Sequence, residues 1–508
     1  NELVEDFSLG LERTFTVNYK IFDNTQLNYS KNIRSDMSEY REEVLSKLKV
    51  GSLTNLNETF NYTFGPQWIS WFKPNFTYNA NYTWNQPLNS VIDAANLNLV
   101  KNTAVNLSIS PTDIIETFYT PLSKRKSKPS SRSRSRGLSS LNAEEEKGKE
   151  TKKEPDNKKE RPEINSLFLE RVYNESKKIE PLTLTITNNT NRLSNGVQGD
   201  IPLGYRLGFK DSHGISSVSE VGLNTGNEDI KKSFTARSGL RFNPQTSLSI
   251  SFNESISSNI NGYSIDIRST SRDYISFGNN LSKGFPFINW SLRLGGLEKI
   301  SFLKPYVNSV SIEHAFSGKQ NLSWKFNEEG ITPINLFGIS SFEDDFNDSL
   351  QFARVTRAFT PFIGISTSFK NGISTNIRSN ITHTLDEVAT GLTYISDNSI
   401  LATITYNFSR GIRFELPFTD RNINLKNNMN ISLNFDFSNK KEEGSKDKIN
   451  FVEQNFSNSR KSILRVTYTL TDDVTGSLFY EYRENDTRLT GRRIDRDFGI
   501  NLNVAIRG

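Results

Sequence analysis

The chain of 508 residues combines a low apolar content with many aromatic residues: the hydrophobic types make up 34% of it, and Phe, Trp and Tyr alone make up 11%. It carries a formal net charge of +5, and it contains three histidines and no cysteine. The aromatic content argues against a disordered chain, the low apolar content argues against several conventional globular domains, and the lack of thiols excludes disulfides, thiolate nucleophiles and cysteine-bound metals.

The apolar residues do not form a membrane-spanning helix, since no stretch approaches the roughly 18–20 uncharged apolar residues that such a helix needs. The chain begins at Asn1 without the basic and then apolar segments of a signal peptide. We therefore expect a mature product or a piece of a longer protein.

The first predicted strand, residues 9–21, shows the pattern that dominates the chain. Apolar residues such as Phe15 and Tyr19 stand at odd positions, whereas the even positions from Thr14 to Lys20 are polar. A period of two places the apolar residues on one face of a strand. Runs of the same kind recur at 72–84, 248–252, 310–316, 404–408, 431–437 and 498–506. They indicate on the order of twenty strands, many of about 9–13 residues, against a usual length of about 5–6.

Helices are predicted only in connections between strands. One is expected at about 36–50, where apolar residues recur every three to four positions and Gly51 provides a stop. A shorter helix is expected after Pro111, and another at about 164–175.

Segment 122–163 differs from the rest of the chain because it is nearly free of Ile, Val, Phe and Tyr and is rich in Ser, Lys, Glu and Pro. Such a composition cannot bury enough surface to offset the entropy of ordering, which predicts a disordered insertion. A polybasic tail for RNA or anionic lipid is the alternative interpretation. The stretch 124–163 carries a net +6, which leaves −1 for all other residues, so we expect no nucleic-acid partner for the remaining chain.

The length of the loops predicts how successive strands pair. In 362–381 the apolar residues are odd on both sides of Asn371-Gly372, so a two-residue turn would place the second set on the wrong face. A three-residue loop, Lys370-Asn371-Gly372, keeps Phe369 opposite Ile373. The same reasoning predicts a loop at Thr471-Asp472-Asp473. Tight turns of this kind predict an antiparallel, up-and-down sheet.

Long two-faced strands predict the fold class: an all-β, transmembrane, antiparallel up-and-down β-barrel with a few short helices in its connections. Its wall would turn apolar side chains to lipid and polar ones to a wet interior. The candidate lipid-facing residues are Ile363, Ile365, Phe369, Ile373, Ile377, Leu433, Phe435, Phe437, Val466, Tyr468, Leu502 and Val504. The candidate lumen-facing residues are Ser366, Ser368, Asn376, Arg378, Ser432, Asn434, Arg465, Thr467, Asn501 and Asn503. The candidate interfacial aromatics are Trp68, Trp71, Trp84, Trp290 and Trp324.

This interpretation divides the chain into three parts. Residues 1–121 hold barrel strands with the short helix, 122–163 form the disordered insertion, and 164–508 hold barrel strands to the C-terminus. A soluble or cell-surface β-rich adhesin or structural protein without a channel is the alternative. A solenoid would show a fixed repeat and a sandwich would show shorter strands, and the sequence has neither.

No motif in the sequence indicates catalysis. The acidic run Glu343–Asp348 lacks the glycine-punctuated spacing of a calcium loop, and His314 and His383 lie in strand patterns. The phosphate-binding patterns GxxxxGK[ST] and GxGxxG do not occur. We expect neither an enzyme nor a cofactor-binding or metal-binding protein.

Three stretches resemble the SprA/Sov family, the giant outer-membrane translocon of the type 9 secretion system, which is related to gliding motility. They are PFIGISTSFKNGISTNIRSNITH at 361–383, LKPYVNSVSIEHAFSGKQNLSW at 303–324 and YEYRENDTRLTGRRIDRDFGINLNVAIRG at 480–508. These are strand-and-turn signatures, and the resemblance lies mainly in residues 230–508.

The resemblance implies a very large bacterial outer-membrane barrel through which folded cargo proteins with C-terminal sorting domains reach the cell surface. It also implies a PorV-like shuttle barrel and a plug protein as partners. Because members of the family are several times longer, this chain would be a C-terminal part or a separate piece. Its strands would then complete a larger barrel together with an N-terminal part of the protein or with separate chains.

Overall fold

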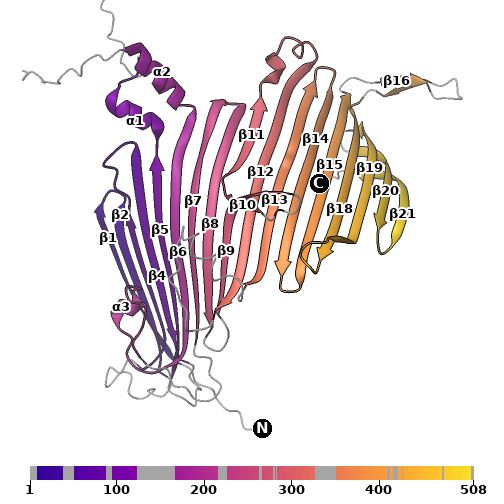
Figure 1. The fold of residues 1–508 in the computed structure, drawn as a ribbon. Coiled ribbons are helices and arrows are strands. Elements are labelled where there is room, and N and C mark those ends of the chain that lie inside the picture. The colour runs from indigo at the N-terminus through magenta and orange to yellow at the C-terminus, as the bar shows by residue number, and fades with distance from the viewer. Residues whose placement is uncertain are drawn as a thin grey trace, which may run out of the picture.

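The computed structural model consists almost entirely of antiparallel strands (Figure 1). It describes residues 9–37, 51–86, 94–122, 166–215, 226–261, 266–278, 281, 283–326, 350–408, 412–415, 422–425, 427–471 and 474–504. Nineteen strands form one sheet, and two short strands form a separate hairpin. The architecture confirms the prediction of an all-β, antiparallel, up-and-down fold.

The first part of the chain contributes eight strands and three helices. The strands are β1 (Gly10–Phe22), β2 (Thr25–Asp36), β3 (Ser52–Phe64), β4 (Phe72–Asn85), β5 (Ala95–Ile109), β6 (Ile179–Val197), β7 (Asn227–Asn243) and β8 (Thr246–Asn261). The helices are α1 (Pro111–Phe118), α2 (Ser166–Ser176) and α3 (Leu203–Arg206).

The second part contributes the remaining strands and one 3-10 turn, η3 (Leu297–Lys299). The strands are β9 (Asp266–Phe277), β10 (Lys283–Pro286), β11 (Asn289–Gly295), β12 (Val307–Phe326), β13 (Leu350–Phe369), β14 (Ile373–Val388), β15 (Gly391–Phe408), β18 (Met429–Ser445), β19 (Val452–Thr471), β20 (Val474–Thr487) and β21 (Gly491–Val504). The separate hairpin is β16 (Ile412–Glu415) with β17 (Asn422–Leu425).

Neighbouring strands of the sheet follow the order of the chain, with one exception between β8 and β12. There β9 and β11 share a single place in the sheet, because each of them pairs with both β8 and β12. β9 takes the half near Asn259 and β11 takes the half near Ser249. The end of β9 leaves the sheet and pairs with β10.

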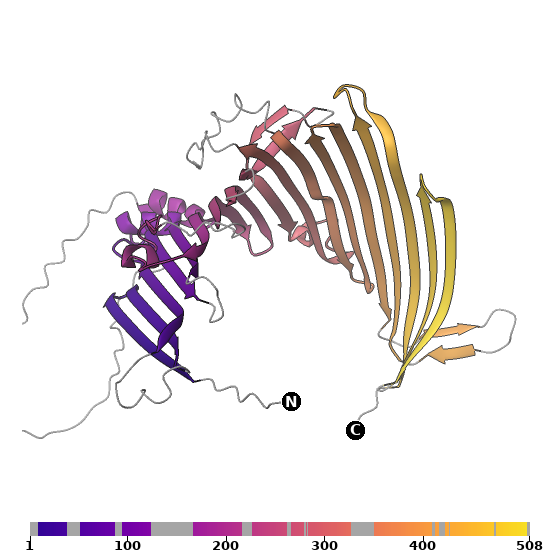
Figure 2. The same cartoon turned by 90° about the horizontal axis from the view of Figure 1, so that it is seen from below.

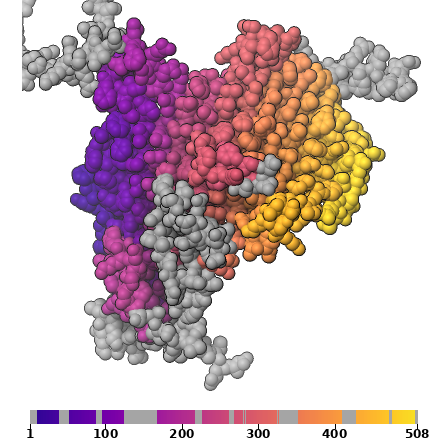
Figure 3. Space-filling model, in the orientation of Figure 1, coloured from indigo at the N-terminus to yellow at the C-terminus, as the bar shows by residue number. Residues whose placement is uncertain are grey.

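The sheet bends into an open trough, which Figure 2 shows along the strands. Within the described residues, β1 pairs only with β2 and β21 pairs only with β20, so the sheet does not close on itself. The backbone groups on the outer side of these two strands therefore form two free edges. Figures 1 and 3 present the convex side of the trough, from which the segment around α3 stands out at the lower left.

The geometry of the turns keeps the apolar face and the polar face of each strand aligned with those of the next strand. Ser368 pairs with Ser374, the Gly372 N–H donates to the Phe369 carbonyl, and Gly372 has φ +88°, as the predicted three-residue loop requires. The hairpin after β19 differs from its prediction. Thr471 pairs directly with Val474, and a register shift after Thr469 supplies the extra residue that keeps both faces aligned.

The structure contains two of the three predicted helices, α1 and α2, within the described residues. α1 follows Ser110, whose side chain accepts from the Asp113 N–H, and α2 spans residues 166–176. The expected helix at about 36–50 begins too early, because β2 continues through Asp36; its residues 38–50 lie outside the described residues. Most of the 122–163 insertion also lies outside them, and only Leu122 is described.

Candidate functional site

One face of the sheet is apolar in nearly every strand, and the strand register aligns these positions across the wall. In the second half, direct Cα partners connect five neighbouring strands through Ile404, Leu433, Leu464, Tyr480 and Phe498. In the first half, partners connect Val17, Tyr29 and Phe60. Many of these side chains are exposed, including Phe498 at 64%. Contiguous apolar surface of this extent marks an interaction face.

All twelve candidate lipid-facing residues lie on this apolar face. The alternation and the pairings place them there together; they are Ile363, Ile365, Phe369, Ile373, Ile377, Leu433, Phe435, Phe437, Val466, Tyr468, Leu502 and Val504. The ten candidate lumen-facing residues lie on the opposite face, and they are Ser366, Ser368, Asn376, Arg378, Ser432, Asn434, Arg465, Thr467, Asn501 and Asn503.

The opposite face is polar and nearly neutral, and in the first half of the chain it carries a row of asparagines. Six of them are successive direct partners across β1 to β6: Asn18, Asn28, Asn61, Asn79, Asn102 and Asn189. Within the row the Asn79 amide donates to the Asn61 side-chain oxygen. Charges on this face occur in pairs such as Arg378 with Glu313, 2.7 Å apart.

Hollows of the surface lie on the polar face in four places. Ser366, Ser368 and Asn376 line one of them, and Asn102 and Asn189 line another. The polar face is therefore the concave side of the trough, and the apolar face is the convex side seen in Figure 3.

The apolar face does not run the whole length of the strands. In each half of the sheet a charged residue or a histidine interrupts it, and beyond that point ionisable residues share the convex face with apolar ones such as Leu99, Ile256 and Leu385. We call the uninterrupted apolar part of the convex face the apolar band, and we call the ionisable residues that follow it the charged belt. Members of the belt include Lys31, Glu58, Lys101, Arg192, Lys232, Glu254, Arg272, Arg357, His383, Lys441, Arg460, Glu484 and Arg496.

The end of the apolar band that borders the charged belt, which we call its lower limit, is displaced between β14 and β21. In β14 the band ends at Ile381, before His383, and Leu385 lies farther along the same face. The row of direct partners that starts at Ile381 runs through Asn398, Asn439, Asn458 and Asp486 to Arg492. In β21 the band ends at Phe498, before Arg496 on the same face, and Phe498 is six residues along the strand from Arg492. The limit thus moves by six residues between β14 and β21, which are separated by five steps from one strand to its neighbour.

The first half of the sheet shows the same shift in the same direction. A row of partners runs from Tyr29 through Phe60, Ala80, Lys101, Thr190 and Ile230 to Ser258. Tyr29 is the last apolar residue before Lys31, whereas in β8 that residue is Phe252, before Glu254. The limit again moves by six residues, here between β2 and β8, which are separated by six steps from one strand to its neighbour.

The shift measures the angle at which the strands cross the limit of the apolar band. With a rise of about 3.3 Å per residue and about 4.8 Å between strands, the two halves give angles of about 40° and about 35°. Strands of membrane barrels tilt by about 35–45°. The band itself covers nine residues in β14, from Ile373 to Ile381, and a tilted strand needs about 9–11 to cross a bilayer.

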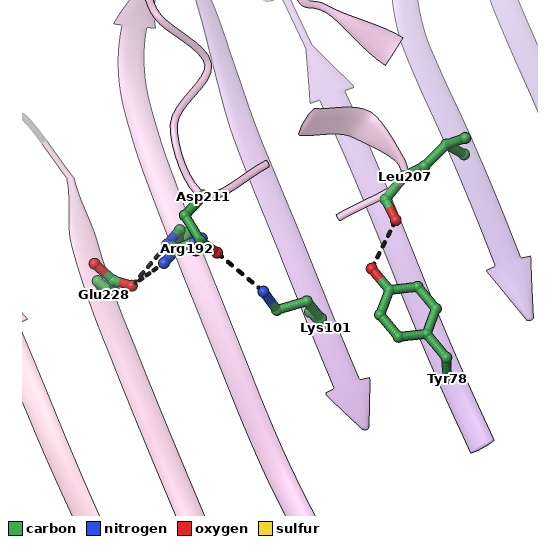
Figure 4. Close-up of polar contacts among 6 residues, drawn as sticks. All are labelled: Tyr78, Lys101, Arg192, Leu207, Asp211 and Glu228. Carbon is green, nitrogen blue, oxygen red and sulfur yellow. Dashed lines mark hydrogen bonds and ion pairs between the residues drawn. The ribbon is translucent and has the colours of Figure 1, made fainter. Parts of the chain in front are cut away.

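A segment between β6 and β7, residues 198–215, folds back over the charged belt; we call it the covering segment. It contains α3, and its Arg206 makes two hydrogen bonds to the buried carboxylate of Glu58, one of them from Nε to Oε2 at 2.6 Å. Its Asp211 accepts from Lys101 at 3.0 Å and from Arg192 at 2.8 Å, and the Tyr78 hydroxyl donates to the Leu207 carbonyl at 2.8 Å (Figure 4). Charged residues of β3, β5 and β6 thereby gain partners from one loop.

An apolar core lies beneath the covering segment. Tyr205 is 1% exposed and its ring meets that of Tyr82 edge to face at 6.3 Å. The remaining members of this core are Leu56, Ala95, Leu97, Leu99, Val197 and Ile201. The covering segment therefore buries side chains of the strands that would otherwise be exposed at this end of the wall.

Ion pairing and burial set the protonation of the covering segment. Hydrogen bonds from Arg192 and Lys101 lower the pKa of Asp211, and the hydrogen bonds to Glu58 raise the pKa of Arg206. Burial lowers the pKa of His213, whose Nδ1 lies 3.2 Å from the Ile215 N–H. At neutral pH the segment thus holds an ionised Asp211 and a neutral His213.

The candidate interfacial tryptophans lie at different heights of the wall. Trp68 is 80% exposed in the connection before β4, and Trp71 lies beside it at the start of that strand. Trp84 packs against the core beneath the covering segment. Trp290 is the second residue of β11 but lies beside the middle of β12, stacked on Phe316 at 4.3 Å. Trp324 belongs to β12, and its side chain is outside the description.

The pairings of the covering segment were not predicted. A signal for them exists in the sequence, because Lys31, Glu58, Lys101 and Arg192 occupy positions where the alternation calls for apolar residues. Such breaks in a strand pattern indicate a polar partner from elsewhere in the chain.

Comparison with known proteins leaves the family open: no protein-family model matches the chain, and no curated protein is significantly similar to it. Among the described residues, no helix is long and apolar enough to cross a membrane. The same residues contain no group of three or more His, Asp or Glu side chains placed to hold a metal ion.

Proposed function

We propose that this chain forms part of the wall of a protein-conducting barrel in a bacterial outer membrane. The observation that carries the proposal is the tilted lower limit of the apolar band. A planar bilayer would meet every strand at one height, so tilted strands would change from apolar to charged at a regularly shifting position. The two angles of about 35° and about 40° agree with the tilt of membrane barrels.

The exposed convex face supports the same proposal. Phe15, Tyr19 and Ile500 are 59%, 62% and 71% exposed, and burying apolar surface of this kind yields about 25 cal/mol per Å². In water these side chains would favour aggregation, whereas in lipid they are already in an apolar environment.

The free edges of β1 and β21 imply further strands. Unpaired backbone groups inside a bilayer cost several kcal/mol each, so a lipid-embedded sheet has to close. We propose that strands from an N-terminal part of the same protein or from separate chains complete the barrel, as in the SprA/Sov family that parts of the sequence resemble.

The polar concave face suits a conduit for proteins. Asparagine, serine and threonine side chains form hydrogen bonds without a strong field, and the charges among them include pairs such as Arg378 with Glu313. Cargo of varied surface charge would pass such a wall without being held. By resemblance we propose type 9 secretion cargo with C-terminal sorting domains, together with a PorV-like shuttle barrel and a plug protein.

Depletion of the chain tests this function. Cargo with sorting domains is expected to accumulate in the periplasm, while an outer-membrane barrel assembled independently of this route keeps its normal level. Undisturbed secretion after depletion would contradict the translocon proposal. A chain that stays soluble and monodisperse after lysis without detergent would contradict the membrane location and would favour an adhesin or structural protein.

A further inference from the structure

The covering segment meets the wall at the lower limit of the apolar band. Its Phe209 stacks on Tyr78 with ring centroids 5.7 Å apart and meets Phe60 edge to face at 5.6 Å. On the strand next to Tyr78, the charged belt begins at Lys101, the direct partner of Ala80. Phe209 therefore lies at the level where the first ionisable residues, Glu58 and Lys101, enter the convex face.

The segment is two-sided at this level. Tyr205 and Arg206 point to the wall, where Tyr205 is buried in the core and Arg206 is bound to Glu58. Leu203 and Phe209 are outside the core and are 55% and 63% exposed, and the neighbouring Lys210 is exposed as well. Two large apolar side chains next to a lysine are the composition of a surface that lies in a membrane interface.

The position of Phe209 is fixed by contacts on both sides of it. The Tyr78 hydroxyl donates to the Leu207 carbonyl, and Asp211 is bound to Lys101 and Arg192. Gly208 has φ +76°, and a Cβ there would lie 2.4 Å from the Tyr78 hydroxyl oxygen. The chain can pass so close to the wall only because glycine occupies this position.

We propose that the covering segment is an interfacial membrane anchor: Leu203 and Phe209 enter the headgroup region of one leaflet, and Lys210 faces its phosphates. The inference rests on the proposed membrane location and adds the height of the bilayer on the wall. The lower limit of the apolar band then coincides with one membrane surface. The charged belt and the ends of the strands beyond it project into water.

Spin labels on single cysteines test the anchor, because the chain contains no cysteine of its own. The full chain is reconstituted into vesicles of phosphatidylcholine and phosphatidylglycerol with one label at a time. The variants are Leu203→Cys and Phe209→Cys in the segment, Phe435→Cys in the apolar band and Leu489→Cys in the turn before β21. Leu489 is 90% exposed beyond the charged belt and serves as the aqueous control. Collisions with oxygen and with a water-soluble nickel chelate report the depth of each label.

The labels at 203 and 209 are expected to lie between the two controls, with Phe435→Cys protected from nickel and Leu489→Cys open to it. Replacing Phe209 removes a ring that contacts the wall, and this loss alone could release the segment. Leu203 lies outside the core, so the Leu203→Cys variant tests the anchor without that loss. Nickel access at 203 and 209 equal to that at 489, with 435 protected, would overturn the anchor alone. Nickel access at all four positions would overturn the membrane location itself.

Discussion

Arg206 and Glu58 are 148 positions apart in the sequence and are joined by two hydrogen bonds on the convex face of the wall. The Glu58 carboxylate is fully buried, and it also accepts from the Tyr29 hydroxyl at 3.0 Å and lies 3.3 Å from the Lys31 ammonium. A buried carboxylate is tolerated only where its charge is compensated in this way. The relationship explains how a short loop can hold its place on the wall.

Removal of the guanidinium is expected to loosen the covering segment. Arg206→Met leaves Glu58 buried with Lys31 and Tyr29 as its remaining partners, and the expected loss is about 2–3 kcal/mol of local stability. Hydrogen exchange of the Leu207 and Gly208 amides, which are bonded inside the segment, measures it. Arg293→Met is the matched control, because Arg293 is 63% exposed and 4.0 Å from its partner. Equal exchange in the two variants would contradict the role of Arg206.

Acid is expected to release the covering segment. The lowered pKa of Asp211 means that its ion pairs contribute fully above the unfolded value of about 3.9 and are lost as the pH falls through the folded value. The lowered pKa of His213 acts in the same direction. Its contribution to the stability of the segment is complete above the unfolded value of about 6.5 and is lost as the pH falls through the folded value. The mobility of a spin label at position 203 should therefore rise in two stages on acidification, and His213→Phe should abolish the stage nearer neutrality. A mobility that does not change between pH 7 and about 4 would refute the histidine stage, and one that does not change on further acidification would refute the aspartate stage.

The covering segment is expected to need glycine at position 208, because a side chain there would collide with Tyr78. Gly208→Ala adds a methyl group against the Tyr78 hydroxyl at a backbone conformation that costs about 1–2 kcal/mol for other residues. Gly214→Ala imposes a similar φ, +69°, with nothing within 4 Å, so it isolates the cost of the backbone. Proteolysis of the segment should accelerate more for Gly208→Ala than for Gly214→Ala. Equal rates would show that the close approach to Tyr78 is unimportant.

A lysine placed in the apolar band should disturb the wall more than one placed beyond it. Phe435 and Asn439 lie on the same face of β18, four residues apart, on either side of the limit of the band. Phe435→Lys is expected to cost about 2–4 kcal/mol in the stability of the membrane-inserted form, and Asn439→Lys about 0–1 kcal/mol. Refolding titrations into lipid vesicles measure both. Similar costs at the two positions would contradict the assignment of the band.

Much of the wall follows from local pattern. The odd positions of β14 and the single glycine at Gly372 were enough to predict the faces and the three-residue turn, because a shift of one residue would turn every side chain over. The place that β9 and β11 share could not be predicted in this way. Each strand alternates like any other, and only the pairing of both with β12 reveals that the two fill one place.

The covering segment escaped prediction for a different reason. Residues 198–215 have no periodicity, and their order depends on Glu58, Lys101 and Arg192, which are distant in the sequence. Each of these charges looked like an isolated exception within its own strand. Only the register brings them to one side of the wall.

The tilt of the strands in a bilayer is the most direct test of the membrane wall. Polarised infrared spectroscopy of the chain reconstituted in oriented lipid layers reports the mean angle between the strands and the membrane normal through the amide bands. The shift of the apolar limit predicts about 35–40°. Strands lying parallel to the lipid layers, or without any preferred direction, would contradict the proposal that the bilayer surrounds the apolar band.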